Sequence, residues 1–275
     1  MSQGIKSEQK VITPVLAAKI LDESNHNNRK LSKPKVKQYV DSMIAGQWVE
    51  NGESLKFDIK GNLIDGQHRL TACVQSGFPF ITTVISGISD QSAFKTIDTG
   101  RPRGANQVLQ MAGFASSNAV AAAARVVEAW DANSEKEKHI ARPSVGVTNT
   151  MILEKAEEFE ESVLKRGVIY AQNFPKGSGD SILFGTYLIL SRIEGGKAEE
   201  FFDKLVGGLF SAKQDPCKLL IDRIYNNLGK WSVWNERTEL MALVFKAYNL
   251  FCENDMSKKR LTWVPTSSFP LPRGV

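Results

Sequence analysis

The segment Asp-Gly-Gln-His-Arg at 65–69 gathers residue types that suit phosphate chemistry. A short extended run at 61–64 precedes it and predicts a strand, whereas the amphipathic stretch at 70–74 predicts a helix. A helix that begins where a strand ends presents unpaired backbone N–H groups and the positive end of its dipole. The spacing therefore predicts an anion-binding turn at 65–69.

The side chains of this segment strengthen the prediction. Gly66 lets the backbone approach a ligand, Arg69 supplies a planar cation, and His68 donates a hydrogen bond or exchanges a proton near neutral pH. We therefore expect Gly66, Gln67, His68 and Arg69 to bind phosphate. An ordinary turn is the competing interpretation, in which Asp65 caps the following helix while His68 and Arg69 point to water.

Phosphoryl transfer also needs carboxylates that orient the acceptor and hold Mg²⁺. Glu53 follows Gly52 at the start of a predicted strand, where a buried charge would be costly. Asp58 lies beside a predicted hairpin turn, and its simpler interpretation is a turn residue. The expected catalytic residues are Glu53, Asp65 and His68, with no metal site formed by protein ligands alone.

A second segment, at 97–103, places Arg101 and Arg103 on either side of a proline. The proline stiffens the chain, so the two guanidinium groups form a fixed cationic pair. A linker with solvated charges would have the same composition. We expect both arginines to bind phosphate beside the same pocket.

A basic run near the C-terminus suggests contact with nucleic acid. Lys258, Lys259 and Arg260 could follow a phosphate backbone, with Trp263 stacking on a base. A solvated basic surface is the alternative. The net charge of +5 fits either interpretation, because 30 acidic residues accompany 35 basic ones.

Length and periodicity predict an α+β protein with two domains. A chain of 275 residues with 42% hydrophobic content exceeds one small domain. We expect a mixed α/β domain at 1–100 and a helical domain at 101–275 that ends in an extended, proline-containing tail. The expected helices are 14–23, with Thr13 as N-cap, 32–45, 105–113, 117–132, 147–167, 180–193, 197–210, 215–228 and 236–253, and the expected strands are 51–58 and 80–86.

The remaining composition excludes several classes. The three cysteines lack metal-ligand spacing and are expected to be reduced core residues. No apolar run has the length of a membrane span, and the first ten residues are polar and expected to be loose, without a signal-peptide core. A cytoplasmic protein with no membrane contact is expected.

Residues 13–98 resemble the N-terminal domain of the ParB/sulfiredoxin-like superfamily, especially its phage and plasmid members with the Asp-Gly-Gln-His-Arg segment. The helix at 32–43, the strand at 51–58 and the turn at 60–62 follow the order of that superfamily. Gly66, His68 and Arg69 match the phosphate loop of sulfiredoxins, but Gln67 replaces the catalytic cysteine, which excludes sulfinic acid reductase chemistry. The resemblance also includes the segment around Arg101.

This resemblance implies binding of ATP or another nucleoside triphosphate with Mg²⁺. It suggests a phosphotransferase or NTPase that acts with DNA, such as a kinase of a modified DNA base. The alternative is a non-catalytic regulator of DNA modification or partition that binds DNA or nucleotide. A nuclease is less favoured, because the sequence lacks a cluster of acids and histidines with metal-ligand spacing.

Overall fold

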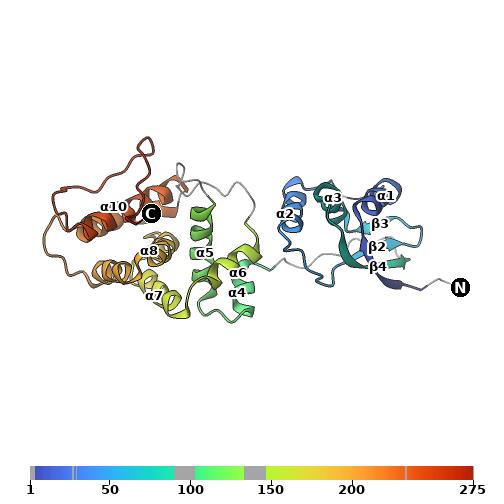
Figure 1. The fold of residues 1–275 in the computed structure, drawn as a ribbon, viewed down its shortest axis with the longest axis horizontal. Coiled ribbons are helices and arrows are strands. Elements are labelled where there is room, and N and C mark those ends of the chain that lie inside the picture. Colours follow the sequence, from blue (N-terminus) through green and yellow to red (C-terminus); the bar gives the residue numbers. More distant parts are fainter. Residues whose placement is uncertain are drawn as a thin grey trace. The chain divides into compact units, whose positions relative to one another are not determined.

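The computed structural model describes residues 4–26, 28, 30–89, 103–132, 147–232 and 234–274. The chain divides into two compact units, Met1–Pro102 and Arg103–Val275. The first unit combines a mixed sheet with helices, and the regular elements of the second unit's described residues are all helices (Figure 1). The predicted α+β class is therefore confirmed.

The sheet of the first unit has four strands in the order β1-β4-β2-β3. Its strands are β1 (Lys6–Ile12), β2 (Ser54–Asp58), β3 (Leu63–Asp65) and β4 (Phe80–Ile88). β4 pairs antiparallel with β1 and parallel with β2, whereas β3 pairs antiparallel with β2. The parallel pair is possible because the chain between β2 and β4 contains a helix that crosses over the sheet.

Three helices pack with this sheet, and α3 contacts the other two. They are α1 (Pro14–Ser24), α2 (Lys33–Ile44) and α3 (Gln67–Ser76). Thr13 caps α1 as predicted, because its Oγ1 accepts a hydrogen bond from the Leu16 N–H at 3.2 Å. The core lies between helices and sheet, where Leu55, Leu70 and Val84 are buried.

Strand β1 corrects the expectation of a loose N-terminus. Its residues Lys6 to Val11 are all exposed, so the strand has no alternation of apolar and polar residues to reveal it. Backbone pairing with β4 over its whole length holds it at the edge of the sheet. Only Ile12 at its end enters the core.

The second unit is a helical assembly around α8. Its helices are α4 (Ala105–Met111), α5 (Ser117–Asp131), α6 (Asn149–Glu157), α7 (Glu161–Gln172), α8 (Asp180–Gly207), α9 (Pro216–Tyr225) and α10 (Trp234–Cys252). Between Ile182 and Leu190 every residue of α8 is buried, and α8 contacts α5, α7, α9 and α10, which makes it the central helix. None of the helices in the described ranges combines the length and apolarity that a bilayer crossing requires.

One helix prediction needs adjustment. The single helix expected at 147–167 is α6 followed by α7. The buried residues Ile152, Ala156 and Phe159 are followed by Leu164 as the next buried position. On one straight helix the five residues from Phe159 to Leu164 would correspond to a rotation of about 140°, so Leu164 would not lie on the same side as the others. The helices expected at 180–193 and 197–210 are confirmed as the two halves of α8, which meet at a kink where Glu194 has the non-helical angles φ −151° and ψ 80°.

The proline-containing tail is an extended strap on the helical unit. Phe269 packs against the rings of Trp130 and Trp263. The Asn249 side chain donates to the Leu271 carbonyl at 2.8 Å and accepts from the Arg273 N–H at 2.8 Å. The tail is thus extended, as predicted, and covers the core beside α10.

Candidate functional site

The segment at 65–69 forms the predicted strand, turn and helix start. Asp65 ends β3, and Gly66 precedes α3 with a φ of 110°. A Cβ atom at Gly66 would lie 2.2 Å from Leu55 Cδ2, which is fully buried. Both the dihedral angle and the close approach require glycine, so this residue fixes the geometry of the turn.

Asp65 does not cap α3, contrary to the simple-turn interpretation. Gly66 occupies the N-cap position, and no side chain caps the helix. The Asp65 carboxylate instead accepts a hydrogen bond from Lys56 Nζ at 2.8 Å and lies 3.5 Å from Arg69 Nη2. Asp65 therefore links β2, β3 and α3 by charge.

Arg69 is directed inward, so the same interpretation is wrong for this residue too. The residue is only 7% exposed, and its Nη2 donates to the Ser54 carbonyl at 2.7 Å. Because Ser54 begins β2, this bond joins α3 to the strand that follows Glu53. Part of the guanidinium is thus committed to the fold.

His68 fastens the start of α2. The Ser32 backbone N–H donates to His68 Nε2 at 3.0 Å. A ring nitrogen that accepts a hydrogen bond carries no proton, so the neutral ring bears its proton on Nδ1. The histidine therefore connects α3 with the N-cap residue of α2.

A pocket of about 250 Å³ opens beside these residues. It brings together five predicted site residues: Glu53, Asp65, Gly66, His68 and Arg69. It is also lined by Lys35, Tyr39, Trp48 and Asn51. No family model, curated protein or solved structure matches this chain. The chemistry of the pocket must therefore be argued from the residues that line it.

Sequence reasoning missed the aromatic wall of this pocket. Lys35 and Tyr39 are one turn apart on α2, and Lys35 Nζ lies 4.6 Å from the Tyr39 ring centroid. Tyr39 meets Trp48 edge to face, with ring centroids 5.2 Å apart. The i,i+4 spacing of a lysine and a tyrosine was a detectable signal. Nothing local links Trp48 to either residue, because it follows the helix in an irregular segment.

Glu53 has a fixed backbone and an exposed side chain. Its N–H donates to Asn51 Oδ1 at 3.1 Å, and its carbonyl accepts from Thr82 Oγ1 at 2.6 Å. A carboxylate held in this way can orient a substrate hydroxyl or help to bind a cation. The main chain thus fixes where the Glu53 side chain enters the pocket.

Asp58 is a turn residue, as its position suggested. Its carboxylate accepts hydrogen bonds from the backbone N–H groups of Lys60 and Asn62, each at 2.8 Å. Burial acts to raise its pKa, but the bonds from Asn62 and Lys60 outweigh burial and lower the pKa of Asp58. The charged carboxylate is therefore used to hold the turn.

Gln67 and Cys73 lie on α3 but do not line the pocket. Gln67 is buried, and its carbonyl accepts from Thr71 Oγ1 at 2.8 Å. Burial raises the pKa of the Cys73 thiol to about 11, so this core cysteine stays protonated at neutral pH. Within the described ranges, no group of three or more His, Cys, Asp or Glu side chains is placed to hold a metal ion.

The other predicted phosphate ligands are placed differently. Arg101 lies outside the described residues. Arg103 is exposed at the start of the second unit, where its carbonyl accepts from Asn149 Nδ2 at 2.8 Å. The expected position of Arg101 and Arg103 beside the pocket therefore stays a prediction.

The basic run Lys258, Lys259 and Arg260 is exposed after α10. Trp263 is not available to stack on a nucleic-acid base, so the expectation for this residue was wrong. Its ring is buried against Phe269, and its Nε1 donates to the Ser268 carbonyl at 3.1 Å. Any contact of this run with nucleic acid would thus depend on charge.

Proposed function

We propose that this protein binds ATP or another nucleoside triphosphate with Mg²⁺ and transfers or hydrolyses its terminal phosphate while engaging DNA. The proposal includes membership of the ParB/sulfiredoxin-like superfamily. One observation carries it: Glu53, His68, Arg69 and two aromatic rings line a single pocket beside the start of α3. A kinase of a modified DNA base is one form that this activity would take.

The lining suggests how a nucleotide would lie. The phosphates would bind near the first turn of α3, where the helix dipole and Arg69 favour negative charge. The base would contact Tyr39 and Trp48. This arrangement uses both the polar and the aromatic side of the pocket.

The charge balance of the lining favours a metal-bound triphosphate. Two cations, Lys35 and Arg69, face two carboxylates, Glu53 and Asp65. A bare triphosphate would gain little from such a balanced site, whereas Mg²⁺ prefers carboxylate and phosphate oxygens together. The donor set therefore fits Mg²⁺, which would neutralise charge on the transferred group.

Glu53 is the leading candidate for a catalytic role. Asp65 is engaged by Lys56 and Arg69, and His68 Nε2 is engaged by Ser32. The exposed Glu53 carboxylate is better placed to orient the phosphate acceptor or to hold Mg²⁺. Asp65 and His68 would then position the loop that surrounds the phosphates.

Replacing Glu53 by Gln should lower the steady-state rate of phosphate release at least tenfold, with nucleotide affinity changed by less than about threefold. The reason is that an acceptor-orienting carboxylate acts mainly in the transition state. Glu50→Gln, a nearby exposed carboxylate outside this pocket, is the matched control. Equal losses of rate and affinity, or no loss, would make Glu53 a structural residue.

A second candidate function is a regulator that binds nucleotide without turnover. It is favoured by the internal hydrogen bonds of His68 and Arg69, because groups committed to the fold contribute less to a reaction. Phosphate release measured with and without DNA separates the two functions. Nucleotide binding without any phosphate release under either condition would support the regulator.

Neutralising Lys258, Lys259 and Arg260 together should weaken DNA binding and leave nucleotide affinity unchanged. Each lost phosphate contact lowers the slope of log affinity against log salt by roughly 0.7 to 0.9, so the triple variant loses up to about 2 to 3 units. Lys176 and Lys213, two separate exposed lysines, provide a control pair. If the wild type shows no salt-sensitive DNA binding, a small-molecule phosphotransferase becomes the leading function.

A further inference from the structure

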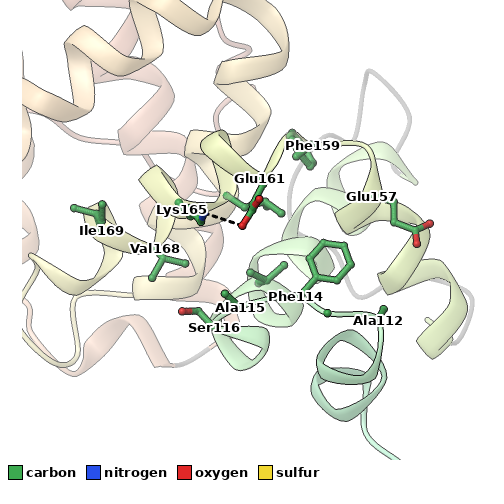
Figure 2. Close-up of a pocket in the computed structure, with 13 residues that line it drawn as sticks. Ala112, Phe114, Ala115, Ser116, Glu157, Phe159, Glu161, Lys165, Val168 and Ile169 are labelled. Carbon is green, nitrogen blue, oxygen red and sulfur yellow. Dashed lines mark ion pairs between the residues drawn. The ribbon is translucent and has the colours of Figure 1, made fainter.

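A groove of about 570 Å³ lies within the helical unit, and none of its lining belongs to the nucleotide pocket. Figure 2 shows its walls. Phe114 comes from the connection between α4 and α5, Phe159 comes from the connection between α6 and α7, and Leu164, Val168 and Ile169 come from α7. We call it the α7 groove.

The two faces of α7 have different environments. On one face, Gly167 packs so closely against α8 that a Cβ there would lie 2.1 Å from Phe184 Cε2. The other face presents Leu164, Val168 and Ile169 to the groove, and Ile169 is 56% exposed. Met111, just before the opposite wall, is 72% exposed. Leu164 and Val168 are buried, so the apolar lining of the groove is open to solvent mainly at Ile169 and in part at Phe114.

Acidic side chains gather at the end of the groove where α7 begins. Glu157 and Glu161 line it, and Glu160 lies between them in the sequence. Glu161 pairs with Lys165 at 2.7 Å (Figure 2). In the part of the chain that the structure describes, neither Glu157 nor Glu160 has an ion-pair partner. Among the described residues, Glu157 and Glu160 therefore leave negative charge at this end of the groove that no ion pair neutralises.

The dimensions and charge of the groove define one type of occupant. From Glu161 to Ile169 the helix axis advances about 12 Å, which matches apolar anchors at i, i+3, i+4 and i+7 on a second helix. We propose that the α7 groove binds an amphipathic helix of a partner protein, with large apolar residues on one face and Lys or Arg beside them. The acidic end sets the preference for a basic helix.

The proposal is tested with synthetic peptides and the 275-residue chain. A labelled 14-residue peptide has leucines at i, i+3, i+4 and i+7 and lysines elsewhere. One comparison peptide replaces the lysines by glutamates, and another has the same composition with the leucines scattered. Fluorescence anisotropy should show the helical leucine–lysine peptide binding about tenfold tighter than either comparison peptide.

Surface variants then assign the binding to this groove. Ile169→Arg should weaken binding of the leucine–lysine peptide at least tenfold, and Glu157→Gln should weaken it about threefold, because they remove an apolar anchor and a charge. Leu209→Arg changes a residue that is 83% exposed and outside the groove, so it should have no effect. Thermal unfolding checks that each variant is folded.

Three results would overturn the proposal. The three peptides could bind alike, or Ile169→Arg and Leu209→Arg could behave alike. In the third, sedimentation shows a dimer of the wild type that Ile169→Arg abolishes, so that a second copy of the chain fills the groove. Loss of nucleotide binding has no bearing on these readouts, because the groove shares no lining residue with the nucleotide pocket.

Discussion

Replacing Gly66 by Ala should lower the free energy of unfolding by about 2 to 4 kcal/mol and abolish nucleotide binding at temperatures where the variant stays folded. Two effects add. The φ of 110° is unfavourable for any residue with a side chain, and the new Cβ would lie 2.2 Å from Leu55 Cδ2 in the core. Urea unfolding measures the first result and calorimetry the second.

Gly61→Ala separates these two effects. Gly61 also has a positive φ, of 82°, but a Cβ there meets no atom within 4 Å. This control should cost only the conformational part, about 1 kcal/mol, and keep nucleotide affinity. Equal destabilisation by both substitutions would show that the contact between Gly66 and Leu55 does not set the geometry of the turn.

Arg69→Met should destabilise the protein by about 2 to 3 kcal/mol and weaken nucleotide binding at least tenfold. Burial of Arg69 is the reason for the first effect, because the Ser54 carbonyl loses its charged donor. The second effect follows if the remaining guanidinium nitrogens contact phosphate. Urea unfolding and nucleotide titration of the same samples measure both.

Lys56→Met is the matched control for Arg69. Lys56 contacts the same Asp65 carboxylate, but its side chain is more exposed and does not line the pocket. The expected loss of stability is below about 1 kcal/mol, with nucleotide affinity unchanged. A folded Arg69→Met variant with wild-type affinity would limit Arg69 to a structural role.

Local signals were sufficient for most of the fold. Thr13 and the proline after it fixed the start of α1, and Gly66 marked the start of α3. The exposed strand β1 lacked such a signal, because its position depends on pairing with β4, almost 70 residues later in the chain. The break between α6 and α7 contains neither glycine nor proline, and packing of Phe159 sets it.

The candidate site likewise combines residues that local sequence reveals with residues that only the fold brings together. The residues at 65–69 were recognisable together because they are adjacent in sequence. Lys35 and Tyr39 reach the pocket from α2, and His68 helps to fix the start of that helix through Ser32. This long-range contact could not be predicted from spacing. The inward orientation of Arg69 likewise depends on where β2 begins, at Ser54.

Nucleotide titration by calorimetry tests the central claim most directly. ATP, CTP, GTP and UTP are each added with Mg²⁺ to the full chain, to Lys35→Gln and to Lys37→Gln, an exposed lysine on the same helix that does not line the pocket. We expect the wild type and Lys37→Gln to bind at least one triphosphate with one-to-one stoichiometry, and Lys35→Gln to bind it about fivefold more weakly. No saturable binding of any triphosphate to the wild type, or equal weakening by the two substitutions, would contradict a nucleotide site in this pocket.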